Sequence, residues 1–138
     1  MAKFSNTTSN GYVRLVFQVT EVRPNIPYND SEVAYHLWLE RNTTYAYDLN
    51  EESLAQAEIN GTRVISKYVS FDLRDKEWIS FGKGTITIPH NEDGSKTITV
   101  RARLTNVANL GDIGWFSGTL DLYTIPRASL ISSVVATE

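Results

Sequence analysis

Apolar and polar residues alternate along most of this chain with a period of two, which is typical of strands that bury one face. The alternation recurs in residues 12–22, 32–41, 55–59, 63–73, 84–88, 96–104 and 114–124. The apolar faces of these stretches predict a core that includes Val13, Leu15, Phe17, Leu37, Leu39, Ile98, Val100, Leu120 and Leu122.

Two polar dipeptides are strong turn signals between alternating stretches. Asn60-Gly61 separates 55–59 from 63–73, and Asp93-Gly94 separates 84–88 from 96–104, so each predicts the corner of a β-hairpin. The spacing of Asn91, Asp93 and Ser95 resembles part of a calcium loop, but no glutamate follows in residues 96–104 to complete it. We therefore expect a turn without a metal ion.

Seven or eight strands joined by short turns predict an all-β fold, an antiparallel β-sandwich of jelly-roll or Ig-like type with about 7–9 strands. Residues 50–58 carry the one run of helix-forming residues, and we expect at most a short turn of helix there. Pro126 cannot donate to a sheet, and the chain becomes rich in small residues after it. These features favour a sandwich module over residues 1–124 and a linker over 125–138, toward a further module or a neighbouring chain.

Composition narrows the class of protein. A chain of 138 residues suits one domain, and its net charge of -3 with no dense basic stripe argues against nucleic-acid binding. It has no cysteine, so disulfides and thiolate metal sites are excluded. No apolar run approaches the length of a membrane span, and we expect no cofactor and no membrane partner.

Catalytic motifs are missing from the sequence. Its two histidines, His36 and His90, have no serine or aspartate partner at a recognisable spacing. There is no nucleophile elbow, phosphate-binding loop or paired-histidine metal motif. We expect that the protein is not an enzyme.

Large aromatic residues at outward positions of the strands are the most informative feature. If the alternation is regular, they share an aromatic and polar surface with several charged residues, provided that their strands lie in one sheet. Sugars offer apolar C–H faces and hydroxyl edges, so this surface is a candidate carbohydrate site. Its members are His36, Trp38, Glu40, Arg101, Arg103, Trp115, Asp121 and Tyr123. Alternatively, a bulge turns one of the rings inward, or another subunit covers them.

Three segments together resemble the N-terminal module of minor structural tail proteins from siphophages of Gram-positive hosts. They are FSNTTSNGYVRLVFQVTEVRPNIPYNDSEVAYHLWLER, TITIPHNEDGSKTITVRARL and SGTLDLYTIPRASLISSV, and the combination of HN-x-DG-x-K with a later TIPRAS is the most specific part. The resemblance implies a virion component at the phage tail, made in the host cytoplasm, and other tail subunits as partners. We also expect a homo-oligomer in the full-length protein.

Two functions fit these observations. The first is a host-attachment module that binds bacterial cell-wall polysaccharide. The second is a purely structural module for spacing or oligomerisation of a tail protein. The outward aromatic residues favour the first, whereas the absence of a defined cluster of polar groups and the linker-like end fit the second equally well.

Overall fold

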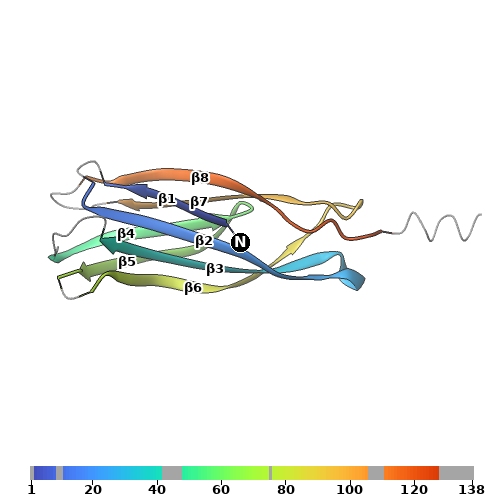
Figure 1. Ribbon diagram of the computed structural model, residues 1–138, viewed down its shortest axis with the longest axis horizontal. Coiled ribbons are helices and arrows are strands. Elements are labelled where there is room, and N and C mark those ends of the chain that lie inside the picture. Colours follow the sequence, from blue (N-terminus) through green and yellow to red (C-terminus); the bar gives the residue numbers. More distant parts are fainter. Residues whose placement is uncertain (1, 9–10, 42–47, 75, 106–110, 128–138) are drawn as a thin grey trace, which may run out of the picture.

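The computed structural model describes residues 2–8, 11–41, 48–74, 76–105 and 111–127. It is an elongated β-sandwich of two four-stranded antiparallel sheets (Figure 1). One sheet has the order β1 (Ala2–Thr7), β2 (Val13–Asn25), β3 (Asp30–Arg41) and β6 (Trp78–Pro89). The other has the order β5 (Thr62–Asp72), β4 (Asp48–Ile59), β7 (Thr97–Thr105) and β8 (Ile113–Asp121). A single 3-10 turn, η1 (Ile26–Tyr28), joins β2 to β3.

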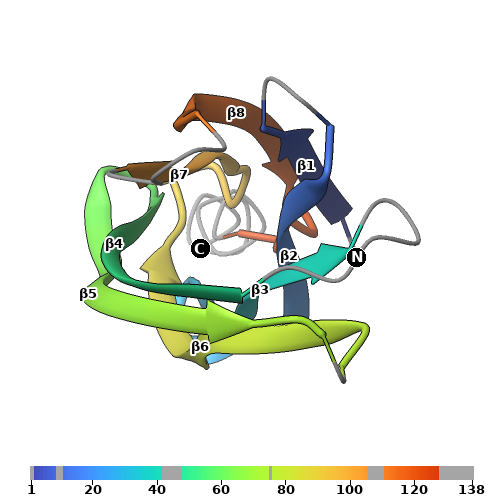
Figure 2. The ribbon, with the colours of Figure 1, turned by 90° about the vertical axis from the view of Figure 1, so that its left-hand side faces the viewer.

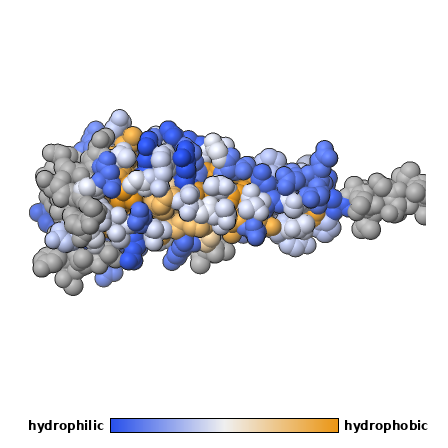
Figure 3. All heavy atoms as spheres, turned by 90° about the horizontal axis from the view of Figure 1, so that it is seen from above, coloured by the Kyte–Doolittle hydropathy of each residue, from blue (hydrophilic) through white to orange (hydrophobic). Residues whose placement is uncertain are grey.

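The predicted all-β sandwich is therefore confirmed, and so is most of the predicted core. The inward faces of both sheets meet in one apolar cluster that contains Val13, Leu15, Phe17, Leu37, Leu39, Ile98, Val100 and Leu122. Leu120 is only partly buried and packs against this cluster. The outer surface is mostly hydrophilic with an apolar band along its middle in the view from above (Figure 3).

The Asn60-Gly61 hairpin is also confirmed. It joins β4 to β5, which pair as antiparallel neighbours. Asn60 has φ 52° and Gly61 has φ 80°, the two left-handed conformations of a mirror-image turn.

Residues 50–58, where at most a short turn of helix was expected, are part of the strand β4, which extends the predicted strand 55–59 back to Asp48. Ser53, Ala55, Ala57 and Ile59 are buried at alternate positions, while Glu58 lies on the outer face. β4 is an inner strand between β5 and β7. Pairing on both sides outweighs the local helix preference of its alanine and glutamate residues.

The Asp93-Gly94 turn is a corner, but the expected hairpin is wrong. β6 pairs with β3, whereas β7 pairs with β4 and β8, so the segment between them crosses from one sheet to the other. The turn itself is built locally. The Asp93 carboxylate accepts the Ser95 backbone N–H at 2.9 Å and its hydroxyl at 2.6 Å. The Asn91 carbonyl accepts the Gly94 N–H at 2.9 Å.

This corner holds the segment that follows β8. The Ile125 N–H donates to the Gly94 carbonyl at 2.9 Å, and the Ile125 side chain is fully buried. The buried ring of His90 also donates from Nδ1 to the same carbonyl, at 2.7 Å. The turn therefore fixes the path of residues 122–127 at the narrow end of the sandwich (Figure 1).

Hydrogen bonds between polar side chains also connect this corner to β2 and β3 near the turn that joins them. His90 Nε2 lies 2.7 Å from the Ser31 hydroxyl, which donates to the Glu21 carboxylate at 2.6 Å. The second Glu21 oxygen accepts the Tyr123 backbone N–H at 2.8 Å. Since residues 128–138 lie outside the described residues, the linker over 125–138 stays a prediction, although its first residue, Ile125, is anchored.

The edges of the two sheets come together where β1 passes β8, which is visible along the long axis (Figure 2). Gly118 on β8 lies under the ring of Phe4 on β1. A β-carbon added at Gly118 would lie 2.0 Å from Phe4 Cε1. Glycine at this position therefore lets the two edges approach.

We predict that Gly118→Ala lowers the free energy of unfolding by about 1–3 kcal/mol, because the new methyl group forces the Phe4 ring out of its place. Urea denaturation measures this cost. Gly114→Ala, on the same strand, is the matched control, because no atom lies within 4 Å of a β-carbon built there. Equal costs for the two variants would show that the contact with Phe4 does not close the edge.

Candidate functional site

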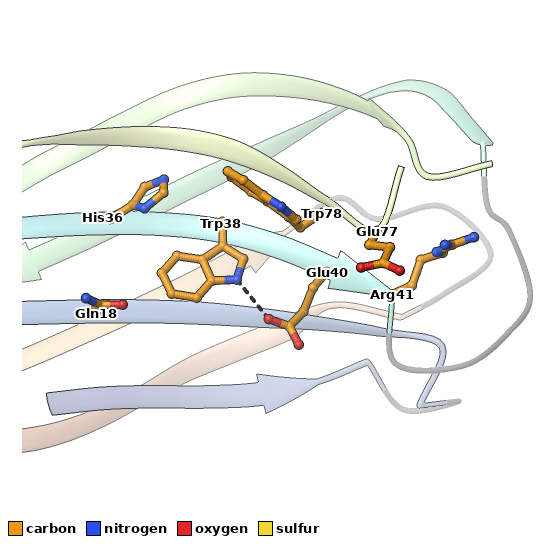
Figure 4. Close-up of a pocket in the computed structure, with 7 residues that line it drawn as sticks. All are labelled: Gln18, His36, Trp38, Glu40, Arg41, Glu77 and Trp78. Carbon is orange, nitrogen blue, oxygen red and sulfur yellow. Dashed lines mark hydrogen bonds between the residues drawn. The ribbon is translucent and has the colours of Figure 1, made fainter. Parts of the chain in front are cut away.

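A groove of about 730 Å³ lies on the outer face of the β1-β2-β3-β6 sheet. Two tryptophans and several polar residues converge on it (Figure 4). The lining residues are Gln18 on β2, His36, Trp38, Glu40 and Arg41 on β3, Glu77, which precedes β6, and Trp78 on β6. Volumes of this size are typical of sites for small molecules.

Strand alternation places His36, Trp38 and Glu40 of β3 on the outer face. On β3, Leu37 and Leu39 enter the core, so the intervening Trp38 points to the opposite face. Trp38 is directly opposite Val16 of β2. Val16 is only 5% exposed although it lies on the outer face, so the Trp38 ring and its neighbours cover an apolar patch there.

The Trp38 ring is held in one orientation. Its indole N–H donates to one Glu40 oxygen at 2.8 Å (Figure 4). The other Glu40 oxygen lies 3.6 Å from an Arg14 nitrogen, and Lys3 Nζ lies 5.6 Å from the centre of the Trp38 ring. One edge of the indole is therefore fixed before any ligand arrives.

Four members of the groove, Gln18, Arg41, Glu77 and Trp78, are not among the site residues predicted from the sequence, and the aromatic one of the four is Trp78. It stands opposite Glu40 in the β3–β6 pairing and is 51% exposed. The sequence pattern predicts this strand only from residue 84, whereas β6 begins at Trp78. The signal that would have identified it is the inward pair Ile79 and Phe81, which places Trp78 on the outward face.

The His36 ring lies close to both indoles. Its ring centre is 4.9 Å from that of Trp38 and 6.0 Å from that of Trp78, the latter in an edge-on arrangement. Partial burial, and then the positive charge of Lys83, lower the pKa of His36 below its ordinary value. The ring is therefore neutral at neutral pH and shares a hydrogen bond of 2.9 Å with the Ser80 hydroxyl.

The single outward surface expected from the sequence does not exist, because its strands belong to two different sheets. His36, Trp38 and Glu40 lie together on β3. Arg101, Arg103 and Trp115 lie together on β7 and β8, which face the opposite side of the sandwich. Alternation along a strand defines its outward side chains but not the sheet to which the strand belongs.

The other two candidates belong to neither group. Asp121 accepts a hydrogen bond of 2.6 Å from the Thr97 hydroxyl across the β7–β8 pair. Tyr123 lies beyond the end of β8, where its backbone is bonded to Glu21. Neither residue lines the groove that contains Trp38 and Trp78.

Within the part of the chain that the structure describes, no three histidine, aspartate or glutamate residues are grouped as a metal site would need. A helix that is long and apolar enough to span a membrane is also missing from those residues.

Comparison with known families matches residues 1–137 to the family described as "Siphovirus protein of unknown function (DUF859)". A search of curated proteins finds no match.

Proposed function

Since this chain belongs to the siphovirus family DUF859, we propose that it is a tail component of the virion whose outer groove binds cell-wall carbohydrate of a Gram-positive host. It would serve as an N-terminal attachment module of a longer tail protein. The observation that carries this proposal is the presence of Trp38 and the half-exposed Trp78 in one groove that is also lined by polar groups.

The chemistry of the groove suits a sugar ring. An indole face offers an apolar platform to the C–H groups of the sugar, and exposed aromatic surface of this kind marks interaction sites. Gln18, Arg41 and Glu77 line the same groove and supply both donors and acceptors for hydroxyl groups. Aromatic walls with a few polar groups are the usual composition of a ligand site.

We propose that the groove binds carbohydrate without cleaving it. The Glu40 carboxylate is engaged by the Trp38 N–H and faces Arg14, so its role is to orient the ring. Weak binding by each module is sufficient for attachment, because several linked copies raise avidity by about 10²–10⁴. Incubation with purified walls is expected to release no soluble sugar.

We predict that Trp78→Ala lowers the apparent affinity for purified cell walls by about tenfold or more, because an aromatic anchor is removed. Trp38→Ala should also lower this affinity, but it exposes Val16 as well. Trp78→Ala is therefore the better test, because it removes the ring without this second effect. Co-sedimentation with walls measures the affinity. Tyr68→Ala is the control, since Tyr68 is an exposed ring on β5, in the other sheet.

Molecular mass in solution separates attachment from a structural role. For an attachment module, light scattering gives the same mass for the parent and for Trp78→Ala. If the parent does not sediment with walls and Trp78→Ala dissociates an oligomer, the groove is instead an interface between subunits, where tryptophan is also enriched.

A further inference from the structure

A cluster of arginines surrounds Trp115 on the outer face of the β5-β4-β7-β8 sheet. The guanidinium carbons of Arg101 and Arg103 lie 4.0 Å and 4.4 Å from the centre of the indole, and that of Arg63 lies 5.9 Å from it. We call these four residues the arginine cluster. The short distances place two guanidinium groups against the ring, as in cation–π contacts.

Hydrogen bonds to β4 fix these side chains further. Arg101 Nε and Arg63 Nη2 donate to the two oxygens of Glu58, at 2.8 Å and 2.7 Å. Arg103 Nε donates to the Gln56 side-chain carbonyl at 2.6 Å. Hydrogen bonds from Arg101 and then from Arg63 lower the pKa of Glu58, which therefore stays ionised.

Positive charge is in excess at this cluster. Three guanidinium groups face one carboxylate, Glu58, while the whole chain carries a net charge of -3. Among the described residues, no protein acceptor is bonded to the terminal Nη atoms of Arg101 or Arg103. Because Nε of Arg101 and of Arg103 is hydrogen-bonded, the guanidinium groups of these two residues are oriented while their Nη atoms are available. Paired N–H groups in this arrangement bind oxyanions.

We propose that the arginine cluster is a second binding site, which takes the phosphate groups of a phosphodiester-linked polyol. The phosphate chemistry follows from the oriented Nη edges alone, whereas the placement of such a polymer on a host surface rests on the proposed function. The two sites lie on opposite faces of the sandwich, so one module could hold a neutral sugar and an anionic polymer at once.

The cluster does not suit a nucleic acid. Sites for single strands combine a basic groove with open aromatic faces on which bases stack. Here the indole of Trp115 is occupied by Arg101 and Arg103. Three cations around one ring also cover too short a span for the regular phosphate contacts of a nucleic-acid groove.

Isothermal titration of the full chain with synthetic poly(glycerol phosphate) tests this proposal. We expect saturable binding that weakens as salt is raised. The double variant Arg101→Gln/Arg103→Gln should lower the affinity by about tenfold or more, since two charge-assisted contacts are removed. Arg23→Gln is the matched control, because Arg23 is an exposed arginine of the other sheet, paired with Glu32 at 3.2 Å.

Each alternative result has a defined meaning. The proposal is overturned if the parent does not bind the polymer, if the double variant binds as well as Arg23→Gln, or if single-stranded DNA binds more tightly than the polymer. Thermal unfolding of the double variant checks that it is folded. Trp78→Ala should retain polymer binding, so a failure of the carbohydrate groove and a failure of the arginine cluster are distinguishable.

Discussion

Replacement of Gly94 by alanine should lower the free energy of unfolding by at least about 3 kcal/mol, the largest effect that we expect from a single methyl group in this protein. Gly94 has φ +88°, a conformation that side chains disfavour by about 1–2 kcal/mol. A β-carbon there would also lie 1.8 Å from the Ile125 carbonyl oxygen. That atom belongs to the backbone, so relief of the clash moves the anchored segment and disturbs the buried Ile125 side chain.

Gly61→Ala is the matched control for Gly94→Ala. Gly61 has φ +80°, but no atom lies within 4 Å of its added β-carbon. It therefore reports the backbone strain alone, about 1–2 kcal/mol. Urea denaturation of both variants measures the difference. If Gly94→Ala costs no more than Gly61→Ala, the corner between β6 and β7 does not hold the segment after β8.

The second large effect is expected for Leu37→Ala, at about 2–5 kcal/mol, because it leaves a cavity in the centre of the core. Leu37 is fully buried and stands opposite Phe17 in the β2–β3 pairing. Thr85→Ala, at an exposed position of β6 in the same sheet, should change stability by no more than about 0.5 kcal/mol. A comparable small loss for Leu37→Ala would mean that the inward face of β3 is wrongly assigned.

Alternation was sufficient to predict the class of fold and the two faces of most strands. Leu37 and Leu39 enter the core because a strand turns successive side chains to opposite sides, which is a local property. Residues 50–58 show where local preference fails. Their alanines and glutamates favour a helix in isolation, and only the pairing of β4 with β5 and β7 makes them a strand.

The sheet to which a strand belongs is not a local property. Asp93-Gly94 is a sound turn signal, and a turn is present there, yet β6 and β7 diverge into different sheets. For the same reason, the residues of the predicted site are split between the two sheets. The sequence identified His36, Trp38 and Glu40 as outward, but it could not separate them from Trp115 and its arginines. That separation depends on pairings between strands far apart in the chain.

Tryptophan fluorescence offers the most direct measurement on the groove. The chain has three tryptophans, so the variant Trp115→Phe leaves only Trp38 and Trp78, both in the groove, as reporters. Titration of this variant with soluble cell-wall glycan fragments should give a saturable change in emission, as a sugar ring displaces water from the two indoles. Saturable wall binding in sedimentation with no change in this emission would contradict a carbohydrate site between Trp38 and Trp78.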